Sequence, residues 1–320
     1  YARPISFDML TLTLQHPLSG RGWVGGAVLA AVGVGLAIKT PTVPFHTWLP
    51  PAHTQAPAAG SAILAGVLLK MGTYGFVRIA MPMLPQQWRQ YAWLFIVVGV
   101  ISVIYGALVA LAQQDFKAMI AYTSVNHMGY ILLALGTAGL LGGTDAQVRT
   151  LAVAGAVTQM VSHGLITGAL FLLSGVLRDR GGTYAMADYS GLAGQAPRFT
   201  ALMGIGFFAS LGLPAFSGFI AEFQIFTGSI AAAPVATGIA VLGIVLTAAL
   251  FLMAFGRMML GELKLPAGRN GRTEFADLEV AELVPIAALL VLSLLIGVLP
   301  RLLLDVLKPG ARAVVDLVGR

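Results

Sequence analysis

Five ionisable residues stand inside or at the end of long apolar runs: Lys39, Lys70, His127, His163 and Glu222. Lys70 lies halfway along the run 57–81, and Glu222 is the only one of the thirteen acidic residues within such a run. A charge at mid-bilayer is costly, so residues of this kind usually face a bundle interior or a wet cavity. Lys39, which closes the run 23–39, could also extend its amine to the membrane surface. The pattern predicts an ion path.

Polar residues at helical spacing accompany the two histidines. One set is Thr123, His127 and Tyr130, and the other is Gln159, His163, Thr167 and Ser174. Spacings of four and seven residues place each set on one face of its helix. Lipid offers these side chains no hydrogen bonds, so both faces should point into the bundle. Linked by water, they would form a lateral proton path.

Two apolar runs are interrupted by residues that break helices. The segment 39–57 contains Pro41, Pro44, Pro50 and Pro51, together with His46 and His53. The segment 211–219 contains Gly212, Pro214 and Gly218. Broken backbone survives at membrane depth only where protein buries it or where it lines a cavity, and paired breaks indicate an ion site between inverted repeats. His46 and His53 either belong to the path or satisfy backbone groups at the first break.

The composition is that of an integral membrane protein. Hydrophobic residues make up 58% of the 320, charged residues 10%, and mean hydropathy is +0.86. Soluble domains carry about 25% charged residues. The absence of cysteine excludes disulfides and cysteine-held iron–sulfur clusters in this chain. The histidine spacing gives no zinc site, and no phosphate-binding loop or dinucleotide fingerprint is present. The net charge of +6 is spread out, which favours lipid headgroups over nucleic acid as a partner.

The spacing of the apolar runs predicts an all-α bundle of about eight transmembrane helices, two of them discontinuous. The expected spans are 22–40, 57–81, 92–113, 117–140, 150–177, 199–230, 235–260 and 281–304. Charges in the linkers, such as Lys117 in 113–117 and Arg178 in 178–198, are expected outside the membrane. The tail 305–320 is either an amphipathic surface helix or frayed, and the first reading is preferred. Because the sequence starts at Tyr1, we expect a fragment of a longer chain.

Four strings carry a resemblance to a known family. They are KTPTVPFHTWLPPAHTQAPAAGSAILAGVLLKMGTYGFVR (39–78), QQDFKAMIAYTSVNHMGYILLALG (113–136), MVSHGLITGALFLLSG (160–175) and LGLPAFSGFIAEF (211–223). At these strings the chain resembles the antiporter-like membrane subunits of respiratory complex I (NADH-quinone oxidoreductase), of the M (NuoM) type. Two departures stand out. Pro51 replaces an acid in the family's LPDAH, and Asn126 replaces the serine of its SHMG.

The resemblance implies an inverted-repeat fold of about fourteen helices, of which this chain would hold helices seven to fourteen. Residues 1–320 would then be a single membrane domain. Within it, 22–81 would end the first repeat, 92–260 would form the second, and 281–320 would add the last helix and tail. Lys39 would be the central lysine of the first half-channel, with its carboxylate partner on an earlier helix. Lys70 would feed Lys39, His127 and His163 would bridge the halves, and Glu222 would be the terminal proton site.

The implied function is proton translocation coupled to NADH:quinone electron transfer, in a bacterial inner membrane. Other membrane-arm subunits, lipid, protons and internal water are the expected partners. This chain is expected to hold no cofactor, with FMN, iron–sulfur clusters and quinone in other subunits. Two alternatives stay open: a subunit of an Mrp-type Na⁺/H⁺ antiporter, or a membrane subunit of a proton-pumping hydrogenase-type complex. The expected site is Lys39, Lys70, His127, His163 and Glu222, supported by Pro41, Pro44, His46, His53, Thr123, Gln159, Thr167 and Pro214.

Overall fold

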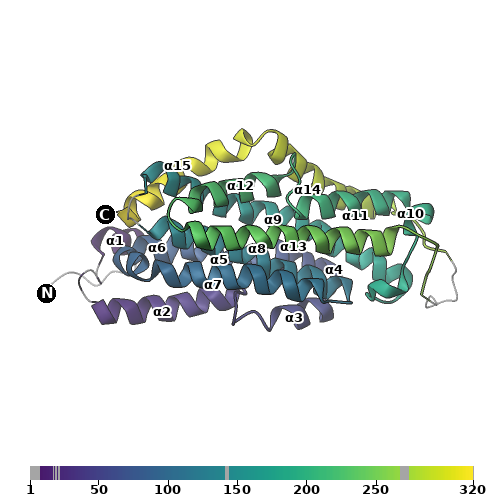
Figure 1. Cartoon of the computed structure of the whole chain (residues 1–320), viewed down its shortest axis with the longest axis horizontal. Helices are drawn as coiled ribbons and strands as arrows, with labels where there is room; N and C mark the ends of the chain where they lie inside the picture. The colour runs from purple at the N-terminus through teal and green to yellow at the C-terminus, as the bar shows by residue number, and fades with distance from the viewer. Residues whose placement is uncertain are drawn as a thin grey trace.

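The helices lie along one common long axis (Figure 1). A computed structural model describes residues 8–16, 18, 20, 22–140, 144–266 and 274–319. The helices are α1 (Met9–Gln15), α2 (Gly22–Lys39), α3 (Leu49–Gln55), α4 (Ala58–Ile63), α5 (Lys70–Gly75), α6 (Met81–Met83), α7 (Pro85–Leu111), α8 (Phe116–Gly139), α9 (Ala146–Gly181), α10 (Leu192–Gln195), α11 (Pro197–Ser210), α12 (Ser217–Ile230), α13 (Pro234–Met259), α14 (Val280–Val298) and α15 (Arg301–Gly319). A short 3₁₀ turn, η3, covers Met186–Asp188.

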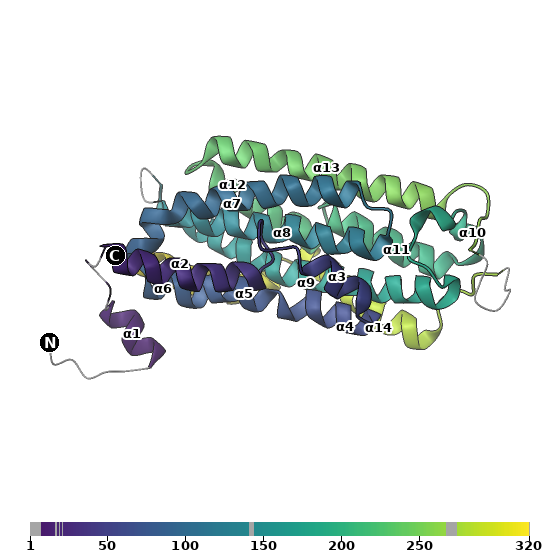
Figure 2. The ribbon, with the colours of Figure 1, turned by 90° about the horizontal axis from the view of Figure 1, so that it is seen from below.

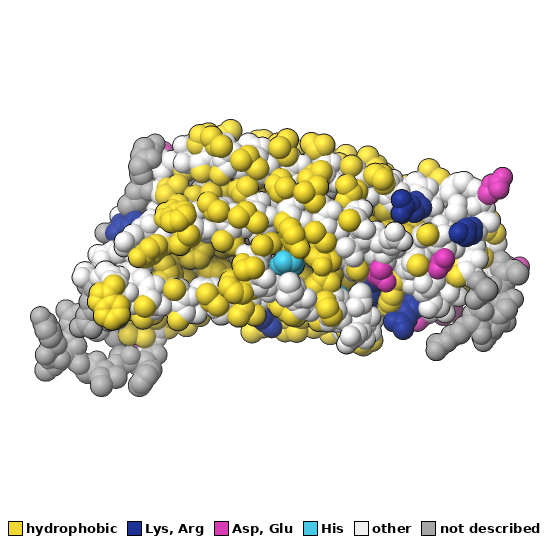
Figure 3. Space-filling model, turned by 60° about the horizontal axis from the view of Figure 1, so that its bottom comes forward, with side chains coloured by type: hydrophobic (Ala, Val, Ile, Leu, Met, Phe, Trp, Pro, Cys, Tyr) yellow, Lys and Arg dark blue, Asp and Glu magenta, His cyan; other side chains and the backbone are white. Residues whose placement is uncertain are grey.

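The prediction of about eight membrane-spanning segments is confirmed. Within the described ranges, seven helical segments are long and apolar enough to cross a bilayer. The sixth expected span is the pair α11 and α12, each only 14 residues long. Apolar side chains cover much of the molecular surface in Figure 3, and most charged side chains in that view gather toward one end. This is the surface that a bilayer requires.

Both predicted helix breaks are present. The first separates α2 from α3 over residues 40–48, and the second separates α11 from α12 over 211–216. In each pair the second helix continues in roughly the direction of the first (Figures 1 and 2). Pro50 and Pro51 fall in the first turn of α3, where missing N–H groups break no helical hydrogen bond.

The second span contains two π-helical segments that the sequence pattern does not predict. They are η1 (Leu64–Leu68) and η2 (Phe76–Ala80), and they flank the short α5. Lys70 is the first residue of α5, and Leu69 alone separates it from the first π segment. Single π turns inside α-helices occur frequently at functional sites because they re-aim side chains.

Helices α8 and α9 occupy the centre of the bundle. In the most apolar stretch of α8, 94% of the residues are buried, and in the corresponding stretch of α9 the share is 78%. Helix α7 packs on α8 at a glycine crossing, where a Cβ on Gly129 would stand only 2.7 Å from the Gly99 carbonyl oxygen. Small residues allow such close backbone contact between membrane helices. The two histidine-bearing helices are therefore enclosed by protein.

The last apolar run is shorter than expected. Helix α14 ends at Val298, and residues beyond Pro300 belong to α15, so the predicted span 281–304 is too long at its C-terminal end. A proline at position 300 cannot donate the N–H that would continue α14. The C-terminal tail is helical, as the preferred prediction states, and it forms most of α15. Its buried residues Ala311, Val315 and Val318 recur at helical spacing, and α15 packs against α9.

Candidate functional site

Lys70 and His163 form the first contact of a polar line through the core. The Lys70 ammonium nitrogen lies 2.6 Å from His163 Nδ1. The same ammonium donates to the Ala65 carbonyl oxygen, which belongs to the π segment just before it. Helix α4–α6 thus supplies both the lysine and one of its acceptors, while α9 supplies the imidazole.

The two histidines stand next to each other across α8 and α9. Their ring centroids are 5.3 Å apart in an edge-to-face arrangement. Gln159, one turn before His163 on α9, lies with its Nε2 2.9 Å from His127 Nδ1. All three side chains are at most 5% exposed. The pair is therefore close enough for one water, or a small ring movement, to connect them.

Glu222 ends this line on α12. Its Oε1 lies 3.8 Å from His127 Nδ1, and the residue is 6% exposed. Gly212, in the second break, makes room for the carboxylate, because a Cβ there would stand 2.5 Å from Glu222 Oε2. Gly212 also has a φ of +78°, which favours glycine. The broken helix thus brings backbone into direct contact with the acid.

A small enclosed space lies at the middle of the line. Its volume is about 10 Å³, which is room for a single water. It is lined by His127, Gln159, Ser162, His163, Ile166, Thr167, Ala209, Ser210, Gly218 and Glu222. Gln159 Oε1 and His163 Nε2 have no hydrogen-bond partner within the described residues. Buried polar atoms of this kind are usually satisfied by ordered water.

The structure brings Lys70, His163, His127 and Glu222 together, with Gln159 and Thr167 beside them, but it does not bring Lys39 into this line. Lys39 is the half-buried last residue of α2, at the first break. Within the described part of the chain, no salt bridge to Lys39 is present. The Thr123 hydroxyl donates to the Ile120 carbonyl of its own helix, at 2.8 Å. Thr123 therefore contributes to α8 more directly than to the line.

The remaining predicted residues lie at the breaks. His46 is buried in the first break, edge-on to the rings of Tyr105 and Tyr122 at 5.0 and 6.2 Å. Pro41 is buried and Pro44 is exposed in the same break, and Pro214 is exposed in the second break. His53, on α3, is fully buried and stacks on Phe171 of α9. These prolines influence the site through the backbone conformation of the two breaks, because a proline side chain has no polar group.

One ionisable residue of a linker, Lys117, is enclosed by protein. From the sequence it is expected in the linker between two spans, and the structure shows it fully buried as the second residue of α8. Its ammonium donates to the Ala56 carbonyl oxygen at 2.6 Å. The polar string QQDFK resembles a loop, and no local pattern in the sequence reports that Ala56, sixty-one residues earlier, covers the lysine.

Comparison with known proteins identifies the family of the chain. The family described as "NADH:quinone oxidoreductase/Mrp antiporter, TM" matches residues 5–247. The chain belongs to this family. It is 44% identical over 309 residues to NADH-quinone oxidoreductase subunit M of Rickettsia bellii, covering 96% of this chain and 59% of that protein. It is 38% identical over 314 residues to F(420)H(2) dehydrogenase subunit M of Methanosarcina mazei, covering 98% of this chain and 60% of the relative.

Solved structures show the same fold. A chain of respiratory complex I from Thermus thermophilus matches with a TM-score of 0.83 and 32% identity, over 98% of this chain and 66% of that one. A chain of the Mrp complex from Dietzia sp. matches with a TM-score of 0.82 and 24% identity, over 94% of this chain and 61% of that one. The second likeness concerns the fold alone. The chain described here spans about 59% of the length of its curated relatives from Rickettsia.

Proposed function

We propose that this chain translocates protons as part of an antiporter-like subunit M of NADH-quinone oxidoreductase. The observation that carries the proposal is the line Lys70–His163–His127–Glu222, in which successive side chains from four helical segments lie in contact or within one water of each other. Amine, imidazole and carboxyl groups exchange protons, and burial makes the charged form of each group costly. A change of charge at one group therefore shifts the proton occupancy of the next.

The partner subunits and cofactors follow from the same proposal. The electron-transfer reaction would belong to other subunits, which would hold FMN, iron–sulfur clusters and quinone. This chain would contribute the proton path within the membrane arm and would lie in a bacterial inner membrane. The 44% identity to a subunit M supports complex I over an Mrp-type Na⁺/H⁺ antiporter, for which the likeness is limited to the fold.

Lys70→Ala tests the proposal in the intact complex. In inverted membrane vesicles, proton pumping should fall strongly while the subunits still assemble, because the variant removes the amine that contacts His163. Replacing Na⁺ by K⁺ in the buffer should leave wild-type pumping unchanged, whereas a Na⁺ requirement would favour the antiporter. Undiminished pumping by an assembled Lys70→Ala complex would refute the proton line.

A further inference from the structure

Three buried serines form a chain of hydroxyl groups that the proposed proton line does not use. They are Ser162 on α9, Ser217 on α12 and Ser293 on α14. The side-chain oxygens of Ser162 and Ser217 lie 2.8 Å apart, and those of Ser217 and Ser293 lie 2.7 Å apart. Each of the three residues is at most 1% exposed. Three helices therefore meet in one continuous hydrogen-bonded chain, which we call the hydroxyl triad.

One end of the hydroxyl triad reaches the proton line. Ser162 lines the small central cavity together with His127, His163 and Glu222. Ser217 is the first residue of α12, directly after the second break. Glu222 lies five residues further along the same helix, so the contacts of Ser217 hold the half-helix that carries the carboxyl group.

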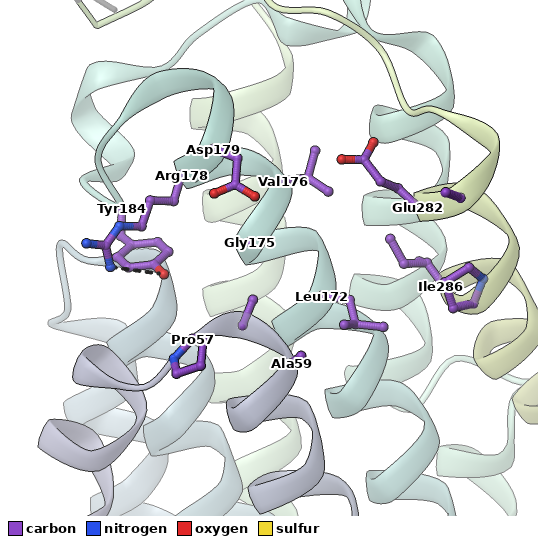
Figure 4. A pocket seen from close by; sticks show the side chains of 13 residues that line it. Pro57, Ala59, Leu172, Gly175, Val176, Arg178, Asp179, Tyr184, Glu282 and Ile286 are labelled. Atoms are coloured by element: carbon purple, nitrogen blue, oxygen red, sulfur yellow. Dashed lines mark hydrogen bonds between the residues drawn. The ribbon is translucent and has the colours of Figure 1, made fainter. Parts of the chain in front are cut away.

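The other end of the hydroxyl triad lies on α14, away from the proton line. Ser293 does not line the central cavity, and among the described residues its hydroxyl bonds only to that of Ser217. Nearer the outer end of α14, Glu282 pairs with Arg180 of α9 at 2.6 Å. A pocket of about 520 Å³ lies between α4, α9 and α14 at that end, with Glu282 and Ile286 on its wall (Figure 4). Ser293 is seven residues beyond Ile286, about 10 Å along the helix, so the triad joins α14 to the bundle deeper than this pocket.

The direction of the hydrogen bonds is open in the hydroxyl triad, whereas a second pair of buried hydroxyls has a fixed direction. Thr137 donates to the Ala134 carbonyl of its own helix, so Ser229, 2.9 Å away, has to donate to Thr137. Across the described ranges, no hydroxyl of the triad bonds to a backbone carbonyl. Each hydroxyl carries one proton and two lone pairs, and it rotates to suit its partners. The oxygen positions of the triad therefore admit both directions.

We propose that the hydroxyl triad is a reversible hydrogen-bond chain that adjusts to the charge in the central cavity, with its three serines as positioning residues for the proton line. The inference rests on the proposed proton-translocating function. With Glu222 ionised, each hydroxyl would donate toward the cavity, and Ser162 would donate into it. With Glu222 neutral and a proton on a nearby imidazole, every hydroxyl would turn, so that Ser162 presents its oxygen to the cavity and Ser217 donates to Ser293. Each hydroxyl keeps its own hydrogen and only rotates about its C–O bond.

A reversible chain stabilises both charge states of the cavity. A hydroxyl that donates to a buried anion stabilises it, and the polarised hydroxyls behind it strengthen that bond. A donor of fixed direction would stabilise the anion alone and would hold the proton line in that state. The reversed direction needs an acceptor for the Ser217 hydroxyl, because a buried donor without a partner is costly. Ser293 supplies this acceptor from within the apolar stretch of α14.

Alanine at the two ends of the hydroxyl triad should affect Glu222 in opposite ways. Ser162→Ala removes the donor that faces the cavity, so the carboxyl group should be protonated more often. Ser293→Ala removes the acceptor of the reversed chain, so the donating direction should prevail and the carboxyl group should be ionised more often. Each variant should change the ratio of the two forms by about tenfold, which is the effect of one hydrogen bond.

The measurement is the infrared band of the protonated Glu222 carboxyl in the assembled complex, identified by its loss in Glu222→Gln. It is recorded at the pH where the wild-type band has half its full intensity, so that it can grow or shrink. Ser124→Ala is the matched control and should leave the band unchanged. This buried serine of α8 donates within its own helix, to the Ile120 carbonyl at 3.3 Å, and does not line the cavity.

A stronger band in Ser162→Ala and a weaker band in Ser293→Ala support the reversible chain. Loosened packing would change both variants in the same way, so parallel changes, or bands equal to that of Ser124→Ala, would overturn it. If Ser162→Ala does not assemble, the Ser293→Ala band decides alone. A weaker band then supports the chain, and an equal or stronger band overturns it.

Proton pumping separates this inference from the proposed function. Both end variants should pump less than Ser124→Ala in inverted vesicles, and undiminished pumping would refute a role of the hydroxyl triad in the proton line. If the bands match the control while Lys70→Ala stops pumping, only the reversible chain is overturned. If the bands change in opposite directions but Lys70→Ala pumps normally, the proposed function fails, while the effect of the triad on Glu222 stands.

Discussion

The two helix breaks use the same device and differ in what surrounds them. At the second break, Glu222 has His127 at 3.8 Å, and Gly212 lies against its carboxylate. At the first break, Lys39 is half-buried and makes no ion pair within the described residues. Both helix interruptions leave backbone N–H and C=O groups outside the regular helical hydrogen bonds. Within the described part of the chain, however, only the second break has an ionisable residue paired with another, which is Glu222 with His127.

The breaks also differ in what holds them. At the first break, side chains satisfy the freed backbone. The Ser102 hydroxyl accepts from the Val43 N–H at 3.0 Å, and the Trp48 indole donates to the Ile38 carbonyl at 2.9 Å. At the second break, backbone groups bond to one another, and glycines allow neighbouring backbone to pack closely. The Leu213 N–H donates to the Phe208 carbonyl at 3.1 Å, and the Phe216 N–H donates to the Leu213 carbonyl at 3.3 Å. A Cβ on Gly218 would stand 2.7 Å from the Ala209 carbonyl oxygen, and Gly297 of α14 rests on the Ala215 carbonyl.

The largest effect is expected at Glu222. Glu222→Gln keeps the shape of the carboxyl but cannot cycle a proton, so pumping should fall by about a hundredfold in a normally assembled complex. Glu222→Asp should retain part of the activity, since the acid is pulled back by one methylene. Pumping in inverted vesicles, measured against quinone reduction, checks both. If Gln pumps as well as Glu, the enclosed site at the second break is structural and the comparison between the breaks loses its functional meaning.

The packing at the second break should be the next most sensitive feature. Gly297→Ala would place a Cβ against the Ala215 carbonyl, and overpacking of this kind costs about 1–3 kcal/mol. Hydrogen exchange of residues 211–216 in the assembled complex should rise. Gly256→Ala is the control, because its Cβ would meet nothing within 4 Å. Equal exchange in the two variants would show that α14 does not hold the break.

At the first break, Ser102→Ala should have a smaller effect. The variant removes the acceptor of the Val43 N–H and leaves that donor unpaired, at a cost of about 1–2 kcal/mol. Exchange of residues 40–48 should rise, while exchange of 211–216 stays as in the wild type. Thr150→Ala, which removes a hydroxyl that donates within its own helix, serves as the control. An unchanged exchange rate at 40–48 would mean that the first break is held by other contacts.

Hydropathy and the positions of proline and glycine predict the spans and both breaks, because those features depend on local composition. The burial of Lys117 depends on Ala56 and Tyr184, which are far away in sequence, so the string around it resembles a loop. The π segments around Lys70 have no local signature of their own. The spacing on α9 predicts that His163 faces inward, but the partner that it meets, Lys70, is set by how α5 and α9 pack.

The smallest expected effect concerns the outer end of the second discontinuous helix. Asp277, in the loop before α14, accepts hydrogen bonds from the N–H groups of Arg198 and Phe199 at 3.0 and 2.9 Å and so caps α11. Burial alone would raise the pKa of Asp277, but these bonds and the Leu278 N–H hold the pKa below its ordinary value of 3.8. A lowered native pKa means that the carboxylate stabilises the fold fully above the ordinary value. This stabilisation is lost as the pH falls through the native pKa.

Asp277→Asn should therefore lower the stability of the α11 N-terminus at neutral pH. A helix cap usually contributes about 1 kcal/mol, and the loss here should be below that value because Asp277 is partly in solvent. Exchange of the first α11 amides in the assembled complex should rise at neutral pH, and the gap to the wild type should close below about pH 4. Glu274→Gln, an exposed acid in the same loop, is the charge-matched control. The capping role would be wrong if Asp277→Asn and Glu274→Gln exchanged alike at neutral pH. In that case the second discontinuous helix would be held at its break alone, by Gly218 and Gly297, with no contribution from its outer end.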